Sequence, residues 1–215
     1  MKSDIQLRKD ILDELIFDPS VSSENIAVSA KDGVVTLTGF VPSYADRYSA
    51  ERAVLRVSGV KAVVEELEVK LTNDSIRTDQ EIAKAASEAL AWNVSVPSTV
   101  SITVEDGSIR LRGEVEWQYQ RDSATSAVRW LKGVKNVKNH IAIHQRPQPS
   151  DIKQRIEKAL VRSAEDDAKK IRVSMSDGKV TLSGKVRSRA EVQDAKWAAW
   201  AAPGVNSVET NLVVE

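Results

Sequence analysis

Residues 177–184 read Asp-Gly-Lys-Val-Thr-Leu-Ser-Gly, and this stretch decides the fold of the chain. Asp-Gly is a dipeptide that tight hairpin turns prefer, because these turns need positive backbone angles that glycine adopts at little cost. Val180 and Leu182 then alternate with Thr181 and Ser183, which is typical of a strand with one buried face. The stretch therefore predicts a hairpin turn and the strand that follows it.

The same pattern occurs twice upstream, as Asp-Gly-Val-Val-Thr-Leu-Thr-Gly at 32–39 and Asp-Gly-Ser-Ile-Arg-Leu-Arg-Gly at 106–113. Twenty residues after each closing glycine comes another glycine, which is followed at once by valine. Spacing that persists through three copies indicates a repeated fold. We expect the glycines of this pattern to serve turns and helix ends and to have no chemical role; they are Gly33, Gly39, Gly59, Gly107, Gly113, Gly133, Gly178, Gly184 and Gly204.

Each copy opens with a predicted amphipathic helix. Its apolar residues stand four positions apart, which places them on one helical face. These stripes are Leu7, Ile11 and Leu15; Ile82, Ala86 and Leu90; and Ile152, Ile156 and Leu160. An aspartate precedes each stripe, and we expect Asp4, Asp79 and Asp151 to cap the three helices, because a carboxylate can accept hydrogen bonds from the free N–H groups there.

The remaining periodicities of each copy predict a strand before the Asp-Gly turn, a strand after it, a second helix and a third strand. The fold class is therefore α+β: three tandem repeats, each helix–strand–strand–helix–strand, with two helices packed on one face of a three-stranded mixed sheet. We expect the domains to span residues 1–71, 77–144 and 149–215. The sequence leaves the order of the strands open.

This order of elements, the Asp-Gly-x-Val/Ile-x-Leu-x-Gly strand and the later Gly-Val-x-x-Val resemble the BON domain, a family named for bacterial osmotically inducible and nodulation proteins. The resemblance extends over nearly the whole chain, in three copies. It implies a non-enzymatic module of bacterial stress and envelope proteins that binds phospholipid surfaces or other proteins. It also implies that the repeated glycines are structural.

Composition narrows the possible functions. The 215 residues include 31 basic and 31 acidic side chains, so bulk attraction to nucleic acid is not indicated. The chain has no cysteine, which excludes disulfides and thiolate sites. It has no apolar run long enough for a transmembrane segment. The first residues lack the apolar region of a secretion signal, so we expect a cytoplasmic protein, or a periplasmic one if the sequence is a mature form.

Residues that could carry chemistry are sparse. His140 and His144 stand four apart around the predicted third strand of the second copy, but no further ligand is evident, so we expect no metal site. The serines lack the context of a nucleophile elbow, and no glycine-rich phosphate loop lies between a strand and a helix. We therefore expect no catalytic residues and no cofactor.

Tryptophan is the informative residue. The five tryptophans (Trp92, Trp117, Trp130, Trp197 and Trp200) are all outside the first copy. Trp197 and Trp200 stand beside the predicted core face of the second helix in the third copy, where they could pack between copies or anchor the protein at a bilayer interface. The first helix of that copy adds a basic face. The candidate contact site for lipid or a partner is Trp197, Trp200, Lys153, Arg155, Lys158 and Arg162.

Our leading hypothesis is a stress-associated module that contacts an anionic phospholipid surface or a protein partner through the third copy. The alternative is a holdase-like chaperone or scaffold that binds polypeptide by strand addition at an exposed sheet edge. Binding of single-stranded nucleic acid is disfavoured, because the charges balance and Trp117 and Tyr119 lie at a helix start. The sequence leaves the oligomeric state and the identity of any partner open.

Overall fold

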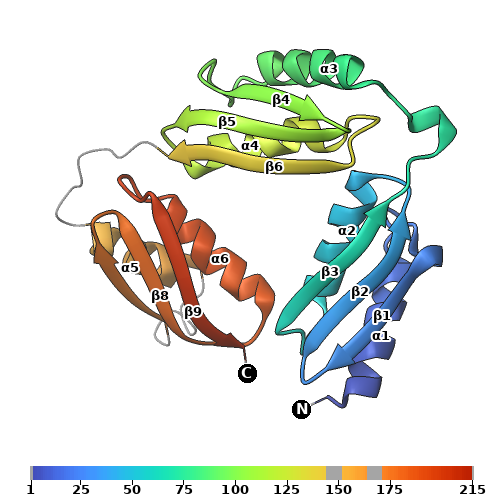
Figure 1. Ribbon diagram of the computed structural model, residues 1–215. Coiled ribbons are helices and arrows are strands. Elements are labelled where there is room, and N and C mark those ends of the chain that lie inside the picture. Colours follow the sequence, from blue (N-terminus) through green and yellow to red (C-terminus); the bar gives the residue numbers. More distant parts are fainter. Residues whose placement is uncertain (1, 144–151, 164–170, 215) are drawn as a thin grey trace. The chain divides into compact units, whose positions relative to one another are not determined.

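The computed structural model describes residues 2–143, 152–163 and 171–214. Within these ranges it contains three repeats of the predicted α+β fold, each with two helices and a three-stranded sheet (Figure 1). The first repeat comprises α1 (Asp4–Phe17), β1 (Ile26–Lys31), β2 (Val34–Val41), α2 (Tyr44–Arg56) and β3 (Ala62–Val69). The second comprises α3 (Asp79–Trp92), β4 (Ser101–Glu105), β5 (Ser108–Val115), α4 (Gln118–Arg129) and β6 (Asn136–Ile143). The third comprises α5 (Ile152–Ser163), β7 (Ile171–Ser176), β8 (Lys179–Val186), α6 (Arg189–Trp200) and β9 (Ser207–Val214).

The second strand lies in the centre of each sheet, which gives the orders β1-β2-β3, β4-β5-β6 and β7-β8-β9. β1 and β2 are antiparallel and are joined by the Asp-Gly turn, whose residues Asp32 and Gly33 both have positive φ angles, as the dipeptide predicts. β2 and β3 are parallel, so α2 forms the crossover between them. The third repeat has the same antiparallel and parallel pairings. The structure thus supplies the strand order that the sequence left open.

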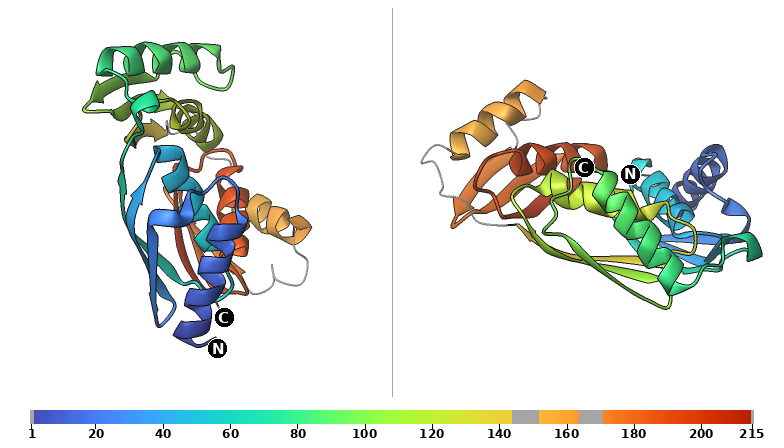
Figure 2. Two further views of the ribbon diagram at one scale, coloured as in Figure 1. Left: turned by 90° about the vertical axis from the view of Figure 1, so that its right-hand side faces the viewer. Right: turned by 90° about the horizontal axis from the view of Figure 1, so that it is seen from above.

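Both helices of a repeat lie on one face of its sheet, as the first repeat shows in Figure 2. The predicted apolar stripes of the first helices are buried in all three repeats. In the first repeat, Leu7, Ile11 and Leu15 pack into one core with Val35 and Leu37 of the central strand. Burial of apolar side chains between helices and sheet is the main stabilising contribution in such a small fold.

The aspartates at the helix starts have a different role from the one expected. The N-cap residues are Ser3 and Thr78, whose hydroxyls accept from the backbone N–H groups of the third helical residues. Asp4 and Asp79 are the first residues inside the helices. The carboxylate of Asp4 accepts from the backbone N–H of the hairpin turn at 3.0 Å, and that of Asp79 accepts from two such groups at 2.8 Å each. These aspartates therefore join the first helix to the turn. Asp151 lies outside the described residues.

The repeated glycines occupy three kinds of position. Gly33, Gly107 and Gly178 lie in the hairpin turns, and Gly59, Gly133 and Gly204 lie between the second helix and the third strand. Gly39, Gly113 and Gly184 lie inside the central strands, and not at turns as expected. Gly39 has a φ of 116°, and a Cβ atom there would overlap the carbonyl oxygen of Asn25. The close approach of that carbonyl, together with the positive φ, explains the requirement for glycine.

By backbone contacts, residues 1–115 and 119–142 form one compact unit, which contains the first two repeats. Residues 143–215, with 116–118, form a second unit, which contains the third repeat. In the described part of the chain, no helix is both long and apolar enough to cross a bilayer.

Candidate functional site

The candidate site lies on the helices of the third repeat. α5 and α6 pack against each other and against their sheet. α5 buries Ile152, Ile156 and Leu160, whereas α6 buries a face made mainly of alanines: Val192, Ala195, Ala198 and Ala199. The small side chains on α6 allow this helix to approach the sheet closely. The opposite sides of both helices are left to form the outer surface of the repeat.

Trp197 lies on this outer surface. It stands two residues from both Ala195 and Ala199, and a step of two residues turns an α-helix by about 200°. Its side chain therefore points away from the core, and it is 73% exposed. An indole that is this exposed on a regular helix contributes little to the stability of its own repeat.

Trp200 has a different environment, although the sequence grouped it with Trp197. It is partly buried and packs against the core that contains Ile156, Leu182 and Ala199. Trp200 thus has a structural role at the end of α6, and the structure separates it from the exposed indole.

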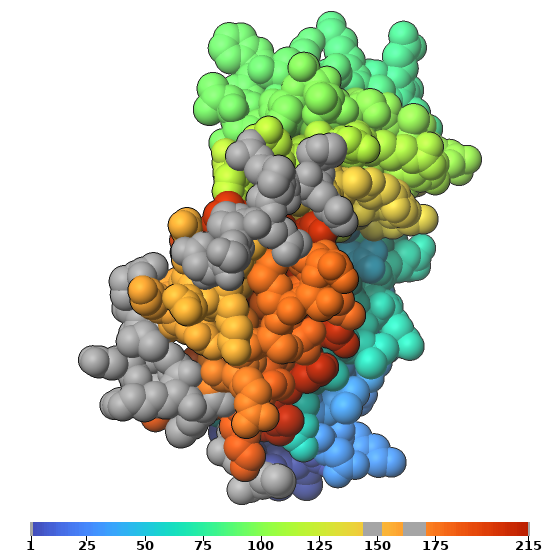
Figure 3. Space-filling view, turned by 90° about the vertical axis from the view of Figure 1, so that its left-hand side faces the viewer, coloured from blue at the N-terminus to red at the C-terminus, as the bar shows by residue number. Residues whose placement is uncertain are grey.

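Basic side chains line the exposed side of α5. Lys153, Arg155 and Lys158 are exposed, and Figure 3 shows the side chains of α5, in light orange, at the surface of the repeat. Lys153 Nζ lies 3.7 Å from Glu157 Oε1, so this carboxylate partly offsets the charge of the lysine. Arg162 belongs to α5, but its side chain lies outside the described part of the structure. We refer to Lys153, Arg155, Lys158 and Trp197 as the α5–α6 surface.

Other exposed aromatic side chains lie on the first two repeats. Trp92, the last residue of α3, is 87% exposed, and Trp130 after α4 is also exposed. Phe17 is the last residue of α1, and thus the counterpart of Trp92 in the first repeat. It is 82% exposed, and sequence reasoning missed it. Its position could have indicated this exposure, because α1 and α3 both have 14 residues and both end on an aromatic residue.

The histidines are not brought together with other metal ligands in the described residues. His140 is exposed on β6, and His144 lies outside the ranges that the structure describes. Among the described side chains, no group of three or more histidines and carboxylates is arranged to hold a metal ion.

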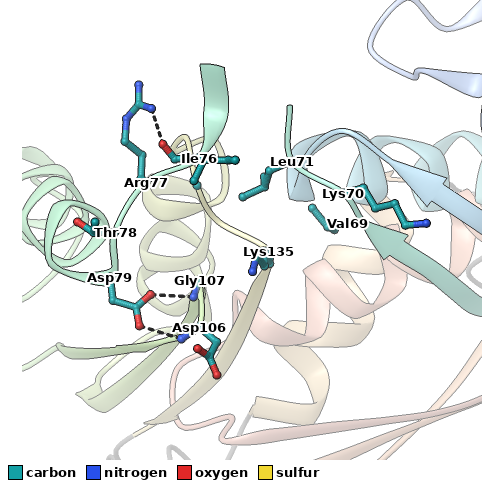
Figure 4. A pocket seen from close by; sticks show the side chains of 11 residues that line it. Val69, Lys70, Leu71, Ile76, Arg77, Thr78, Asp79, Asp106, Gly107 and Lys135 are labelled. Carbon is teal, nitrogen blue, oxygen red and sulfur yellow. Dashed lines mark hydrogen bonds between the residues drawn. The ribbon is translucent and has the colours of Figure 1, made fainter. Parts of the chain in front are cut away.

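A cleft of about 530 Å³ lies where the linker after β3 meets the turn and helix end of the second repeat (Figure 4). Its polar groups are engaged in local structure. Asp79 accepts from the backbone N–H groups of Asp106 and Gly107, and Arg77 donates to the carbonyl oxygens of Asp74 and Ile76 at 3.1 and 2.7 Å. We therefore assign this cleft to the joint between the repeats and not to a ligand.

Comparison with known proteins identifies three segments, at residues 3–70, 78–145 and 149–215, that match the family model described as the BON domain. The chain is 32% identical over 137 residues to osmotically-inducible protein Y of Escherichia coli strain K12, a match that covers 59% of this chain and 66% of that protein. It is 28% identical over 143 residues to an uncharacterized protein encoded in the gshII 5′ region of Anaplasma centrale, covering 65% of this chain and 91% of the relative.

Among solved structures, the chain is similar to CdsD, a structural protein of the type III secretion system of Chlamydia trachomatis. The identity is 16% and the TM-score 0.27, with 98% of this chain and 92% of CdsD covered. A similarity this weak carries no weight in assigning a function to the α5–α6 surface.

Proposed function

The chain belongs to the BON domain family, and on that premise we propose that it is a non-enzymatic binding protein of the osmotic stress response that contacts anionic phospholipid surfaces. The name of its Escherichia coli relative supports the link to osmotic stress. The observation that carries the proposal is Trp197, an indole that is 73% exposed in the same helical layer as the basic side of α5. The α5–α6 surface is the proposed contact site.

The indole supplies the apolar part of the contact. Its ring is amphipathic, and tryptophan is enriched where one end of a side chain meets apolar surroundings and the other meets water, as at the headgroup level of a bilayer. Trp197 can enter the headgroup region of the bilayer without unfolding the repeat, because its side chain makes little contribution to the core. Insertion of the exposed ring would then remove apolar surface from water.

The basic side chains supply the electrostatic part. A lysine or arginine near an anionic leaflet contributes about 1 kcal/mol of attraction. Arg155 and Lys158 stand three positions apart and so share one side of α5, whereas Lys153 lies on the other flank of the exposed surface. Glu157 reduces the contribution of Lys153. Because such attraction is screened over about 10 Å at 0.1 M salt, binding should weaken as salt is raised.

Co-sedimentation with vesicles tests this proposal. We expect the protein to bind phosphatidylglycerol vesicles and to stay in solution with phosphatidylcholine vesicles. Replacing Lys153, Arg155 and Lys158 together by glutamine should weaken binding at least about tenfold, given their electrostatic contribution. The matched control replaces three exposed cations of the second repeat, Lys84, Arg112 and Lys138, by glutamine. Equal binding by the two triple variants would contradict the assignment of the site.

A second candidate function is a holdase or scaffold that binds polypeptide, and it is supported by β9. This strand is one of the two edges of its sheet, and its residue Val213 is 60% exposed. An edge strand with exposed apolar side chains can accept an extended peptide as an additional strand. Suppression of the aggregation of a denatured client in the absence of lipid would favour this function over lipid contact.

A further inference from the structure

The last residue of α4, Arg129, contacts the first repeat. Its guanidinium carbon lies 3.4 Å from the centroid of the Tyr48 ring on α2. The Nε atom of Arg129 is buried, and no hydrogen-bond acceptor for it lies among the described residues. The flat guanidinium thus rests on an aromatic face, and removal from water strengthens that kind of contact.

α2 provides a socket for this arginine. Tyr44, Tyr48 and Glu51 stand at i, i+4 and i+7 and so share one side of the helix, and all three are half-buried. We call these three residues the α2 socket. Beside it lies a small cavity of about 40 Å³, at which Arg47 pairs with Glu65 through two hydrogen bonds of 2.6 and 3.2 Å.

Charge at the socket is consistent with an arginine partner. Burial raises the pKa of Glu51 above its usual range, and the neighbouring Glu65 carboxylate adds to this, whereas Arg47 and Arg129 act in the opposite direction. Burial also raises the pKa of the Tyr44 hydroxyl, again against the effect of Arg129 and Arg47. A second arginine, Arg52, also lies over the Tyr48 ring, with its guanidinium carbon 5.8 Å from the ring centroid.

The complementarity is specific to the first two repeats. Counted from the closing glycine of each hairpin, Arg129 corresponds to Leu55 in the first repeat and to Trp200 in the third. The position of Tyr48 is held by Asp122 in the second repeat and by Gln193 in the third. The aromatic side of the contact thus occurs in the first repeat, and the arginine in the second. This pairing is therefore not a consequence of the repeated fold.

We propose that Arg129, seated in the α2 socket, holds the second repeat on the first, so that these two repeats move as one body in solution. The polar linker between these repeats would not hold them together by itself. Domains joined by short linkers move relative to one another unless an interface prevents it. The Arg129 contact supplies that interface. The proposal does not depend on lipid binding, and it concerns the first two repeats only.

Distances between two spin labels, measured by double electron–electron resonance, test the proposal directly. The chain has no cysteine, so Asp13→Cys and Glu88→Cys introduce two unique labelling sites. Both residues are exposed, on α1 and α3 respectively. We expect one narrow distance distribution for this labelled chain. Arg129→Leu, which installs the residue that the first repeat has at this position, should broaden the distribution.

The control variants separate the contact from general effects. Tyr48→Phe keeps the aromatic face and should leave the distribution narrow, whereas Tyr48→Leu removes that face and should broaden it as Arg129→Leu does. Arg112→Leu removes an exposed arginine of the same repeat and should have no effect. Circular dichroism checks that each variant keeps its secondary structure. A broad distribution in the labelled parent chain would overturn the proposal, as would one that stays narrow in both Arg129→Leu and Tyr48→Leu.

Discussion

Gly39 is the residue at which the backbone of the repeat is least tolerant of a side chain. Both Gly39 and Gly59 have positive φ angles, of 116° and 100°. A Cβ atom at Gly59 would meet Leu7 Cδ1 at an ordinary 3.5 Å, whereas one at Gly39 would overlap the Asn25 carbonyl oxygen. We expect Gly59→Ala to cost about 1–2 kcal/mol, from backbone strain alone. Gly39→Ala should cost more, because β1 must also move away from β2.

Urea unfolding of the whole chain, followed by circular dichroism, measures this difference. The unfolding midpoint of the first transition should be lower for Gly39→Ala than for Gly59→Ala. The order of the two midpoints is the decisive result, because both variants gain the same methyl group. Equal midpoints would mean that the close approach of Asn25 is not what requires glycine.

Asp18 gives the first repeat a predictable response to pH. Its carboxylate accepts from Ser20 N at 3.0 Å, Ser20 Oγ at 2.6 Å and an Arg56 NH2 group at 2.6 Å. These bonds lower the pKa of Asp18 from 3.8 to about 2. Because the pKa is lower in the folded state, the stabilisation is present above the unfolded value of 3.8 and is lost as the pH falls through about 2.

We therefore expect Asp18→Asn to lower stability near neutral pH by up to about 1 kcal/mol, the usual range for an exposed ion pair. The difference from the parent protein should shrink as the pH is lowered through the range between the two pKa values. Thermal unfolding at a series of pH values measures this difference, with Asp13→Asn, on the helix that Asp18 follows, as the control for loss of an exposed carboxylate. A difference that stays constant with pH would contradict the role assigned to Asp18.

At the scale of elements, α6 divides its two tryptophans between surface and core. Trp197 is exposed, whereas Trp200 packs against buried residues of the third repeat. We expect Trp197→Ala to change stability by less than about 0.5 kcal/mol, as surface substitutions do. Trp200→Ala should cost about 1–3 kcal/mol, less than a fully buried aromatic residue, because Trp200 is only partly buried. Thermal unfolding of the two variants checks this, and similar losses in both would contradict the division.

Periodicity was sufficient to predict the elements but not their finer contacts. The stripe of Leu7, Ile11 and Leu15 identifies a helix and its buried face, because both follow from local spacing. The helix cap was misplaced by one residue, since Asp4 and Ser3 are both good capping residues and only the position of the hairpin turn decides between them. The parallel pairing of β3 with β2 is likewise a contact between distant segments, which local spacing does not encode.

The candidate site was predictable in part. Lys153, Arg155 and Lys158 follow from the sequence, because a short amphipathic helix exposes its charged side. The sequence did not separate Trp197 from Trp200, since both stand beside the apolar face of α6 and their burial depends on what packs at the end of the helix. Exposure of Phe17 was missed because the aromatic residue belongs to the same helix as a predicted core stripe.

At the scale of the molecule, the three repeats share one fold but differ in their surface residues. Residues 1–72 hold 9 basic and 12 acidic side chains, whereas residues 147–215 hold 12 and 10. Residues 73–146 hold 10 basic and 9 acidic side chains, so the third repeat has the highest net positive charge of the three. The first repeat has the α2 socket, and the second has the arginine that occupies it. Sequence differences outside the repeated core therefore assign separate roles to the repeats.

Tryptophan fluorescence during titration with vesicles tests the central claim most directly. We predict a blue shift of the emission with phosphatidylglycerol vesicles that weakens with added salt and does not occur with phosphatidylcholine vesicles. Trp197→Phe should lose most of this shift, whereas Trp130→Phe, which removes an exposed indole of the second repeat, should keep it. If the emission were indifferent to anionic vesicles, or if Trp197→Phe shifted as the parent chain does, the assignment of lipid contact to the α5–α6 surface would be wrong.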